Sequence, residues 1–299
     1  MKHFIPIVVL VSAMFRPSVM YAENEGAHLL SKALGYFRRS IKMAKEAVDF
    51  VHNQEFEPFV EQGKLVASGP AVFLFCRVWK RLVSEFPEIK VPRTIIWVNG
   101  APGAGKGTNT RNIMRVMGIS THPIIVSDLL HSPEYQQKID QGLLIDDEEV
   151  TYLVFKKIIE ESHNEVGIII DGYPRTLMQA ECAALLQKRI GADRLREITV
   201  VLLVDERTSI LRQKTRGQEA IEHNNQVQAS GHGELQTVRA TDMDDNVART
   251  RYAMFRDQTL NALKYMKKCS NYYSIDAKGS FDEVRNRIYE VLKKENAKL

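Results

Sequence analysis

The sequence is poor in cysteine and has no long run of one charge. Its 299 residues include three cysteines, Cys76, Cys182 and Cys269. This odd, widely spaced set forms neither a disulfide framework nor a CxxC metal site, so each is interpreted as a small apolar residue. The net charge of +4 is small beside 41 basic and 37 acidic side chains. Charge therefore gives no indication of a nucleic-acid partner.

Internal repeats and low-complexity segments are also missing, which argues against solenoid and disordered classes. With 44% hydrophobic and 26% charged residues, the composition is that of a globular protein with one or two domains.

The region 23–92 is predicted to be helical. Its first apolar residues are spaced alternately four and three apart, as on one seam of a helix: Leu30, Leu34, Phe37, Ile41, Ala44, Val48 and Val51. A second apolar segment at helical spacing opens at Gly69-Pro70 and is closed by Pro87 and Pro92. Basic residues on the first helix face either solvent or an anionic surface, and the role of the region stays open.

From Arg93 onward, short apolar runs alternate with amphipathic helices. The runs are Thr94–Asn99, Pro123–Val126, Val166–Asp171, Ile198–Asp205 and Tyr272–Asp276. Continuous apolar strands separated by helices predict an α/β domain over 93–299, with a parallel sheet covered by helices on both faces.

The first of these strands runs directly into a glycine-rich loop and a helical pattern. The loop residues expected to bind a nucleotide are Gly100, Gly103, Ala104, Gly105, Lys106, Gly107 and Thr108. Such a loop points several backbone N–H groups at a phosphate, and Lys106 adds a full charge for the β and γ phosphates. Gly107 stands where a hydroxyl would ordinarily hold Mg²⁺, so the ion is expected to be held mainly by water and phosphate oxygens.

A later strand leads into Asp171-Gly172-Tyr173-Pro174-Arg175, with Gln179 four residues on. Together with the loop Gly100-Ala101-Pro102-Gly103-Ala104-Gly105-Lys106-Gly107-Thr108, this resembles the adenylate kinase family over about 93–299. The resemblance implies a P-loop nucleoside monophosphate kinase that uses ATP and Mg²⁺. It further implies that Asp171 orients water on the metal, Arg175 grips the acceptor phosphate, and Gln179 reads the acceptor base.

The resemblance also implies a lid over about 212–239 and further site residues. Arg212 would stack on the ATP base beside Gly279, whereas Arg216, Arg239 and Arg251 would surround the transferred phosphoryl group. Leu144 and Gly172 would line the acceptor site. With no cysteine between Arg216 and Arg239, the lid resembles no zinc-bearing version.

The acceptor-binding flap departs from the family pattern. Val126 and His131 stand where relatives have Thr and Arg, and the stretch from His131 to Leu144 is short. His131 is therefore expected to be a weak phosphate contact. The expected reaction is ATP plus AMP to two ADP in a monomer. A kinase of another small acceptor, or a nucleotide-binding regulatory or scaffold protein, remains an alternative.

Residues 1–22 are similar to a signal or a short anchor. Lys2 and His3 precede an apolar stretch from Phe4 to Phe15, and Ala22 precedes Glu23. The stretch is short for a membrane span, which needs about 20 apolar residues. Because the chemistry uses ATP, we expect a cytoplasmic protein. Export, or membrane association through this segment, is the alternative.

Overall fold

The computed structural model describes residues Val60–Glu61, Lys64–Leu65, 67–130, 132–141, 144–163, 166–191 and 193–296. Three predictions lie outside these residues: the signal-like segment 1–22, the seam helix over 30–51, and the contact assigned to His131.

The chain divides into two compact units, with the boundary between Arg77 and Val78. In the first unit, β1 (Val60–Glu61) pairs antiparallel with β2 (Lys64–Leu65), which the sequence did not predict. Helix α3 (Gly69–Glu85) follows, and the boundary between the units falls within it. It confirms the predicted helix, and it ends two residues before Pro87, whose ring cannot continue it.

The second unit holds a five-stranded parallel sheet in the order β4-β5-β3-β6-β7. The strands are β3 (Thr94–Gly100), β4 (Ile124–Ile125), β5 (Ile168–Asp171), β6 (Arg196–Leu203) and β7 (Asn271–Asp276). Every residue of β3 is buried, as expected for a central parallel strand covered on both faces. The predicted α/β fold is thus confirmed. Two strands are shorter than expected: β5 begins at Ile168 instead of Val166, and β4 ends at Ile125 because Val126 already begins the 3-10 turn η2 (Val126–Leu129).

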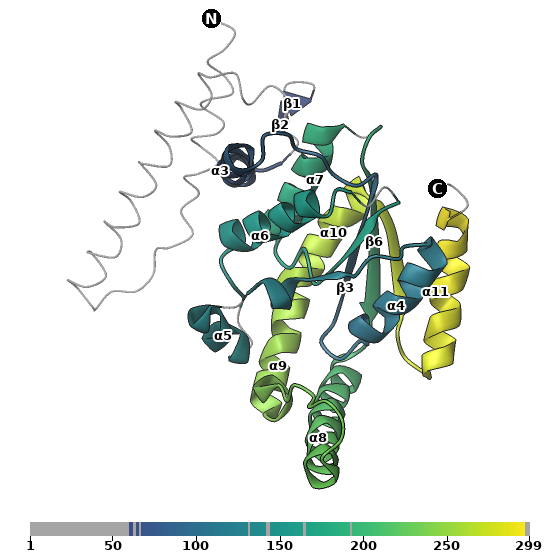
Figure 1. Cartoon of the computed structure of the whole chain (residues 1–299). Helices are drawn as coiled ribbons and strands as arrows, with labels where there is room; N and C mark the ends of the chain where they lie inside the picture. The colour runs from purple at the N-terminus through teal and green to yellow at the C-terminus, as the bar shows by residue number, and fades with distance from the viewer. Residues whose placement is uncertain are drawn as a thin grey trace, which may run out of the picture. The chain divides into compact units, whose positions relative to one another are not determined.

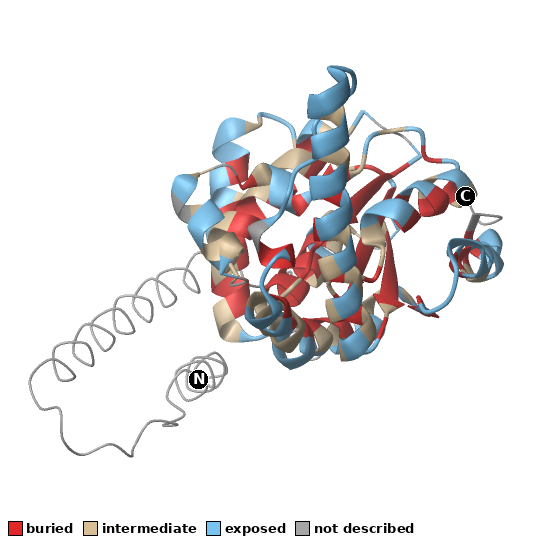
Figure 2. Ribbon diagram, turned by 90° about the horizontal axis from the view of Figure 1, so that it is seen from below, coloured by how far each residue is buried: buried red, intermediate tan, exposed pale blue. Residues whose placement is uncertain are grey.

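Helices cover both faces of this sheet (Figure 1). After α3, the helices in the described part of the chain are α4 (Lys106–Met117), α5 (Pro133–Asp140), α6 (Asp147–Glu160), α7 (Leu177–Ile190), α8 (Glu206–Ser230), α9 (Asp245–Met254), α10 (Leu260–Cys269) and α11 (Phe281–Asn296). Helices α4 and α11 pack on one face, where Ile96 and Val98 meet Ile113 and Ile288. Figure 2 shows the buried residues concentrated in the sheet and on the inner sides of these helices.

One buried residue on β6 carries a carboxyl group. Glu197 is 2% exposed, and neither of its carboxylate oxygens has a hydrogen-bond partner among the described residues. Burial raises the pKa of Glu197 to about 8, and the neighbouring Trp97 indole offsets this only in part. The side chain is therefore held largely as the neutral acid near pH 7.

The end of α3 contacts α6 within the second unit. The Glu85 carboxylate accepts hydrogen bonds from Tyr152 Oη at 2.6 Å and from Lys156 Nζ at 2.9 Å. The Arg81 guanidinium stacks 3.3 Å from the Tyr152 ring centroid and pairs with Glu149. These contacts attach α6, which follows the acceptor flap, to the helix that precedes the sheet.

The predicted lid is built mainly from a helix. Helix α8 runs for 25 residues and ends at Gly231, which adopts a left-handed conformation. The returning chain lies along α8, where Asn224 Nδ2 donates to Gln236 O at 2.8 Å and Gln236 N donates to Asn224 Oδ1 at 2.7 Å. His223 Nε2 lies 3.0 Å from Glu234 O.

Of the helices in the described part of the chain, none combines the length and the apolar character needed to cross a membrane.

Candidate active site

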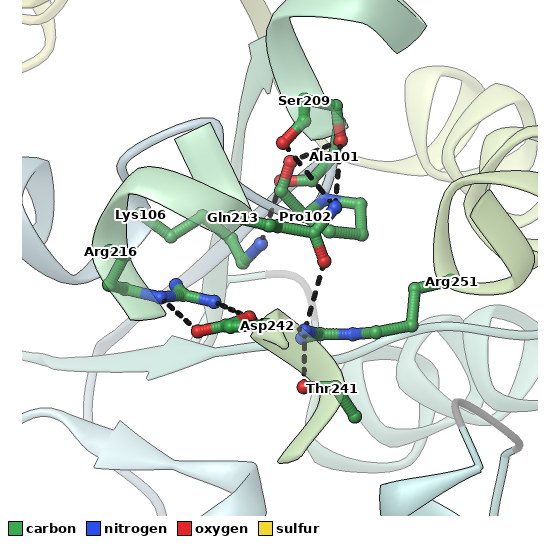
Figure 3. A network of polar contacts seen from close by, with 9 residues as sticks. All are labelled: Ala101, Pro102, Lys106, Ser209, Gln213, Arg216, Thr241, Asp242 and Arg251. Carbon is green, nitrogen blue, oxygen red and sulfur yellow. Dashed lines mark hydrogen bonds and ion pairs between the residues drawn. The ribbon is translucent and has the colours of Figure 1, made fainter. Parts of the chain in front are cut away.

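The glycine-rich loop between β3 and α4 packs closely against the start of α8 (Figure 3). Gly103 has φ +69°, and a Cβ there would lie 2.7 Å from Ser209 O. Only glycine tolerates both constraints. Lys106 Nζ lies over the loop and donates to Gly100 O at 2.9 Å and to Ala101 O at 3.1 Å. The predicted phosphate lysine thus caps the loop's own carbonyls.

Lys106 is surrounded by several charges. Burial lowers the pKa of its ammonium to about 8, Asp171 opposes that shift, and Arg175, Arg251 and Arg216 add to it. The loop lysine, the signature residues and two lid arginines therefore interact electrostatically. A polyanion placed among these cations would be strongly stabilised.

The other predicted loop residues lie where a phosphate could be held. Gly105, with φ 80°, is the N-cap residue of α4, and no side chain caps that helix end. Ala104 is buried, whereas Gly107 and Thr108 are exposed in the first turn of α4. The backbone N–H groups of this turn suit an anion.

Two carboxylates occupy neighbouring strand ends. Asp171 ends β5 and is 9% exposed, and its carboxylate makes no hydrogen bond or ion pair among the described residues. Burial raises its pKa against the opposing charges of Lys106, Arg175 and Arg239, and Asp128 raises it further. Asp128 lies in the turn after β4. The sequence did not single it out, although its position after an adjacent parallel strand was a usable signal.

Arg175 is held in the signature loop by its own neighbours. Its Nε donates to Gly172 O at 2.8 Å, and Thr259 Oγ1 donates to Arg175 O at 3.0 Å. Gly172 has φ +97°, and a Cβ there would meet Arg175 Nη2 at 2.8 Å. A side chain at Gly172 would therefore displace the guanidinium.

Gln179 is buried, and both ends of its amide are engaged. Its Oε1 accepts from Arg175 N at 2.8 Å, and its Nε2 donates to Asp147 Oδ1 at 2.9 Å. The same carboxylate oxygen accepts from Thr176 Oγ1 at 2.7 Å. Asp147 was not predicted. It comes from the start of α6, and nothing local in the sequence marks it as a partner of Gln179.

The remaining acceptor-side positions contribute little polar surface. Val126 is buried with 2% exposure, so it offers no group to a phosphate. Leu144 is half-buried before α6. His131 lies outside the described residues.

Two of the predicted arginines share one buried aspartate (Figure 3). Arg216 Nε and Nη2 donate to the two carboxylate oxygens of Asp242 at 2.7 and 2.6 Å, a bidentate pair. Arg251 Nη1 donates to Asp242 Oδ1 at 3.3 Å and to Thr241 Oγ1 at 2.9 Å. The Asp242 side chain is 1% exposed. Asp242 was missed because its partners lie 9 and 26 residues away.

The other two predicted arginines, Arg239 and Arg212, interact with different residues of the site. Arg239 is exposed, and its charge influences the pKa of Asp171 and Arg175. Arg212 donates from Nη1 to Ala277 O at 2.9 Å and from Nη2 to Gly279 O at 3.3 Å. The structure thus brings Arg212 to Gly279, as the resemblance implied.

Asn99 joins the two motifs and was also missed. Its Nδ2 donates to Pro174 O at 2.6 Å, and its Oδ1 accepts from Gly100 N at 2.8 Å. Its place at the junction of strand and loop was the available signal. Loop and signature are therefore fixed relative to each other by one buried amide.

A phosphate loop at the carboxyl end of a parallel sheet, ringed by arginines, defines the class of P-loop phosphotransferases. Residues 98–271 match the family model "Adenylate kinase". The chain is 32% identical over 196 residues to the adenylate kinase of Deinococcus deserti, covering 63% of this chain and 91% of that protein. It is 30% identical over 200 residues to that of Deinococcus radiodurans, with 63% and 91% covered. The adenylate kinase of Flavobacterium johnsoniae is 27% identical over 200 residues, with 64% and 95% covered.

The chain therefore belongs to the adenylate kinase family. It is an ATP-binding nucleoside monophosphate kinase.

Proposed function

We propose that the acceptor is AMP and that the reaction is ATP plus AMP to two ADP. The bond between the γ phosphorus and the β–γ bridging oxygen breaks, and its electron pair stays on the β phosphate. An oxygen of the AMP phosphate forms the new bond. The observation that carries the proposal is the convergence of Lys106, Asp171 and Arg175, with Gln179 bonded to the Arg175 backbone, in a chain whose relatives are named adenylate kinases.

The donor binds along the glycine-rich loop. The N–H groups of the first turn of α4 hold the phosphates, and Lys106 leaves its two carbonyls to meet the β and γ oxygens. Arg212 stacks on the ATP base beside Gly279, which is supported by its hydrogen bonds to that loop.

The transferred phosphoryl group is stabilised by cations. Phosphoryl transfer needs positioning and charge neutralisation more than covalent help. Arg175 anchors the acceptor phosphate, while Arg216, Arg239 and Arg251 surround the group in flight. The lid over about 212–239 closes on the substrates and excludes water.

Magnesium fits the carboxylate side of the site. Asp171 presents a carboxylate with no hydrogen-bond partner among the described residues, next to the phosphate-binding lysine. Within the described residues, no group of three or more His, Cys, Asp or Glu could enclose an ion. Asp171 would orient water on Mg²⁺, and the ion would neutralise charge on the ATP phosphates.

The acceptor base is read by Gln179 after its amide exchanges partners. Both ends of the amide are engaged with Arg175 and Asp147, so base recognition replaces at least one of these bonds. Leu144 and Gly172 line the same pocket.

The test is a coupled assay of the purified full chain with ATP and, in turn, AMP, GMP, CMP and UMP. We expect AMP to have the highest kcat/KM. A higher kcat/KM for another monophosphate would replace AMP in the proposal, and absence of turnover with all four would overturn the reaction itself.

A substitution sharpens the assignment of the acceptor anchor. Arg175→Lys keeps the charge but loses bidentate geometry, so KM for AMP should rise about tenfold or more while KM for ATP stays within about twofold. Arg115→Lys, at an exposed position on α4, is the matched control. Equal changes in both KM values would remove Arg175 from the acceptor side.

A further inference from the structure

The lid helix α8 carries two buried polar residues to which neither sequence motif assigns a role. Ser209 and Gln213 are both 0% exposed, and they lie four residues apart on one face of the helix. Arg216 follows three residues later on that face. A buried amide and a buried hydroxyl are costly unless they are hydrogen-bonded, so their partners indicate what they do.

Their hydrogen bonds form one continuous chain (Figure 3). Arg251 Nη1 donates to Gln213 Oε1 at 3.0 Å. Gln213 Nε2 donates to Ser209 Oγ at 3.3 Å, and Ser209 Oγ donates to Pro102 O at 2.7 Å. Pro102 belongs to the phosphate loop. This series of hydrogen bonds thus runs from the Arg251 guanidinium, which follows the lid, to a backbone carbonyl of the phosphate loop.

The direction of donation is the same at every step. Because the Ser209 hydroxyl gives its proton to Pro102, its lone pairs are available to accept from the Gln213 amide. Because the amide nitrogen points at Ser209, the amide oxygen is turned toward Arg251. Hydrogen bonds aligned in this way polarise one another, and the chain begins at a positive charge that strengthens it.

We propose that Gln213 is a positioning residue that couples the phosphate loop to Arg251, so that the guanidinium is set in place before the nucleotide binds. Arg251 is also attached to Asp242, which holds Arg216. The arrangement of two arginines therefore depends on the loop conformation through one amide. The expected effect of Gln213 on turnover rests on the proposed function. Its expected effect on the phosphate loop does not.

Turnover is the first measurement. Gln213→Leu keeps most of the side-chain volume and removes both amide contacts, and a hydrogen bond to a charged group is the kind whose loss costs most. We expect kcat to fall about ten- to a hundredfold while KM for AMP changes less than about threefold. Gln218→Leu, at an exposed position on the same helix, is the matched control and should leave kcat unchanged. A Gln213→Leu kcat within twofold of wild type would overturn the proposal.

A double-mutant cycle separates positioning from a general structural effect. If Gln213 acts through Arg251, Gln213→Leu should add less than about a threefold loss in an Arg251→Lys background. If the two substitutions lower kcat by factors that multiply in the double variant, Gln213 acts independently of Arg251. That result would overturn the proposed coupling.

Hydrogen–deuterium exchange of the free protein gives a readout that needs no acceptor. Peptides covering 99–110 should exchange faster in Gln213→Leu and in Ser209→Ala than in wild type, and at the wild-type rate in Gln218→Leu. Unchanged exchange in both variants would overturn the link to the loop. Should wild type turn over no monophosphate, the proposed function fails, and the exchange data alone decide this inference. Ser209→Ala also serves if Gln213→Leu does not fold.

Discussion

The donor side of the site holds more of the predicted cations than the acceptor side. On the donor side, Lys106 bonds two loop carbonyls, and Arg216 and Arg251 share the buried Asp242. On the acceptor side, Val126 is buried and offers no polar group, and the described part of the flap contains one eight-residue helix, α5. Arg175 is the cation placed there by the signature.

This contrast separates two properties of a kinase. Many preorganised charges around the transferred group favour the transition state, and they act on kcat. Affinity for the acceptor depends on how many charged contacts hold its phosphate, and here the sequence offers few. The donor half therefore predicts competent transfer, and the acceptor half predicts weak acceptor binding.

The largest effect is expected from a substitution that removes a charged group from the donor side. Lys106→Met should lower kcat by several orders of magnitude in a folded protein, because the ammonium meets charge that grows in the transition state. Single-turnover transfer from labelled ATP measures it, with circular dichroism as the folding control. Normal turnover of this variant would contradict the whole donor assignment.

The next largest effect is expected from a substitution that adds a charged contact on the acceptor side. His131→Arg should lower KM for AMP about ten- to a hundredfold, because a guanidinium keeps its charge whereas an imidazole is mostly neutral above pH 7. KM for ATP should change little. Steady-state kinetics of both proteins at pH 8 decide the matter, and an unchanged or higher KM for AMP would place His131 away from the acceptor phosphate.

A third change tests the scaffold that both sides share. The pKa of Glu197 is raised in the folded state to about 8 from an ordinary value of 4.5. The folded protein therefore holds a proton that the unfolded chain releases. The contribution of Glu197 to the free energy of unfolding is fully present below about pH 4.5 and is lost as pH rises through about 8.

Glu197→Gln should remove this loss, so the variant should be more stable than wild type at pH 9 by a few kcal/mol, with a smaller gap at pH 5. Urea denaturation at both pH values measures it. Glu219→Gln, at an exposed position on α8, is the control and should show no such change. If the difference in free energy of unfolding between Glu197→Gln and wild type were the same at both pH values, Glu197 would not titrate as described.

The smallest expected effect concerns the region before the sheet. We propose that residues 93–299 form the kinase domain, so removal of 1–92 should leave an ATP-binding protein. That truncation also removes the Arg81 and Glu85 contacts to α6. We expect a Tm a few degrees below that of a 67–299 protein, and a larger rise in KM for AMP than for ATP. Calorimetry and kinetics of the two fragments compare them, and insoluble 93–299 protein would show that the N-terminal region belongs to the domain.

The sequence predicted the framework better than the contacts within it. Continuous apolar runs identified all five parallel strands, because a strand buried on both faces leaves that local pattern. The glycine-rich loop and the signature are likewise local. Asp147 and Asp242 were missed because their significance comes from partners far along the chain, and a lone aspartate in a polar segment is usually only solvated.

The lid shows the same limit. Its residues were assigned from a resemblance, but the 25-residue length of α8 was not predicted. The Gln- and Asn-rich sequence over 213–228 has only weak helical periodicity, since few of its residues are buried. The pairing of Asn224 with the Gln236 backbone supplies order that hydrophobic patterning cannot reveal.

Helix α8 also has a mechanical consequence. Its 25 residues form a rod of about 37 Å, given a rise of about 1.5 Å per residue. Ser209 fixes the base of this rod to the phosphate loop. A tilt of about 10° there would sweep the far tip through about 6 Å. A small rotation of the helix base at the phosphate loop would thus appear as a much larger displacement of the tip.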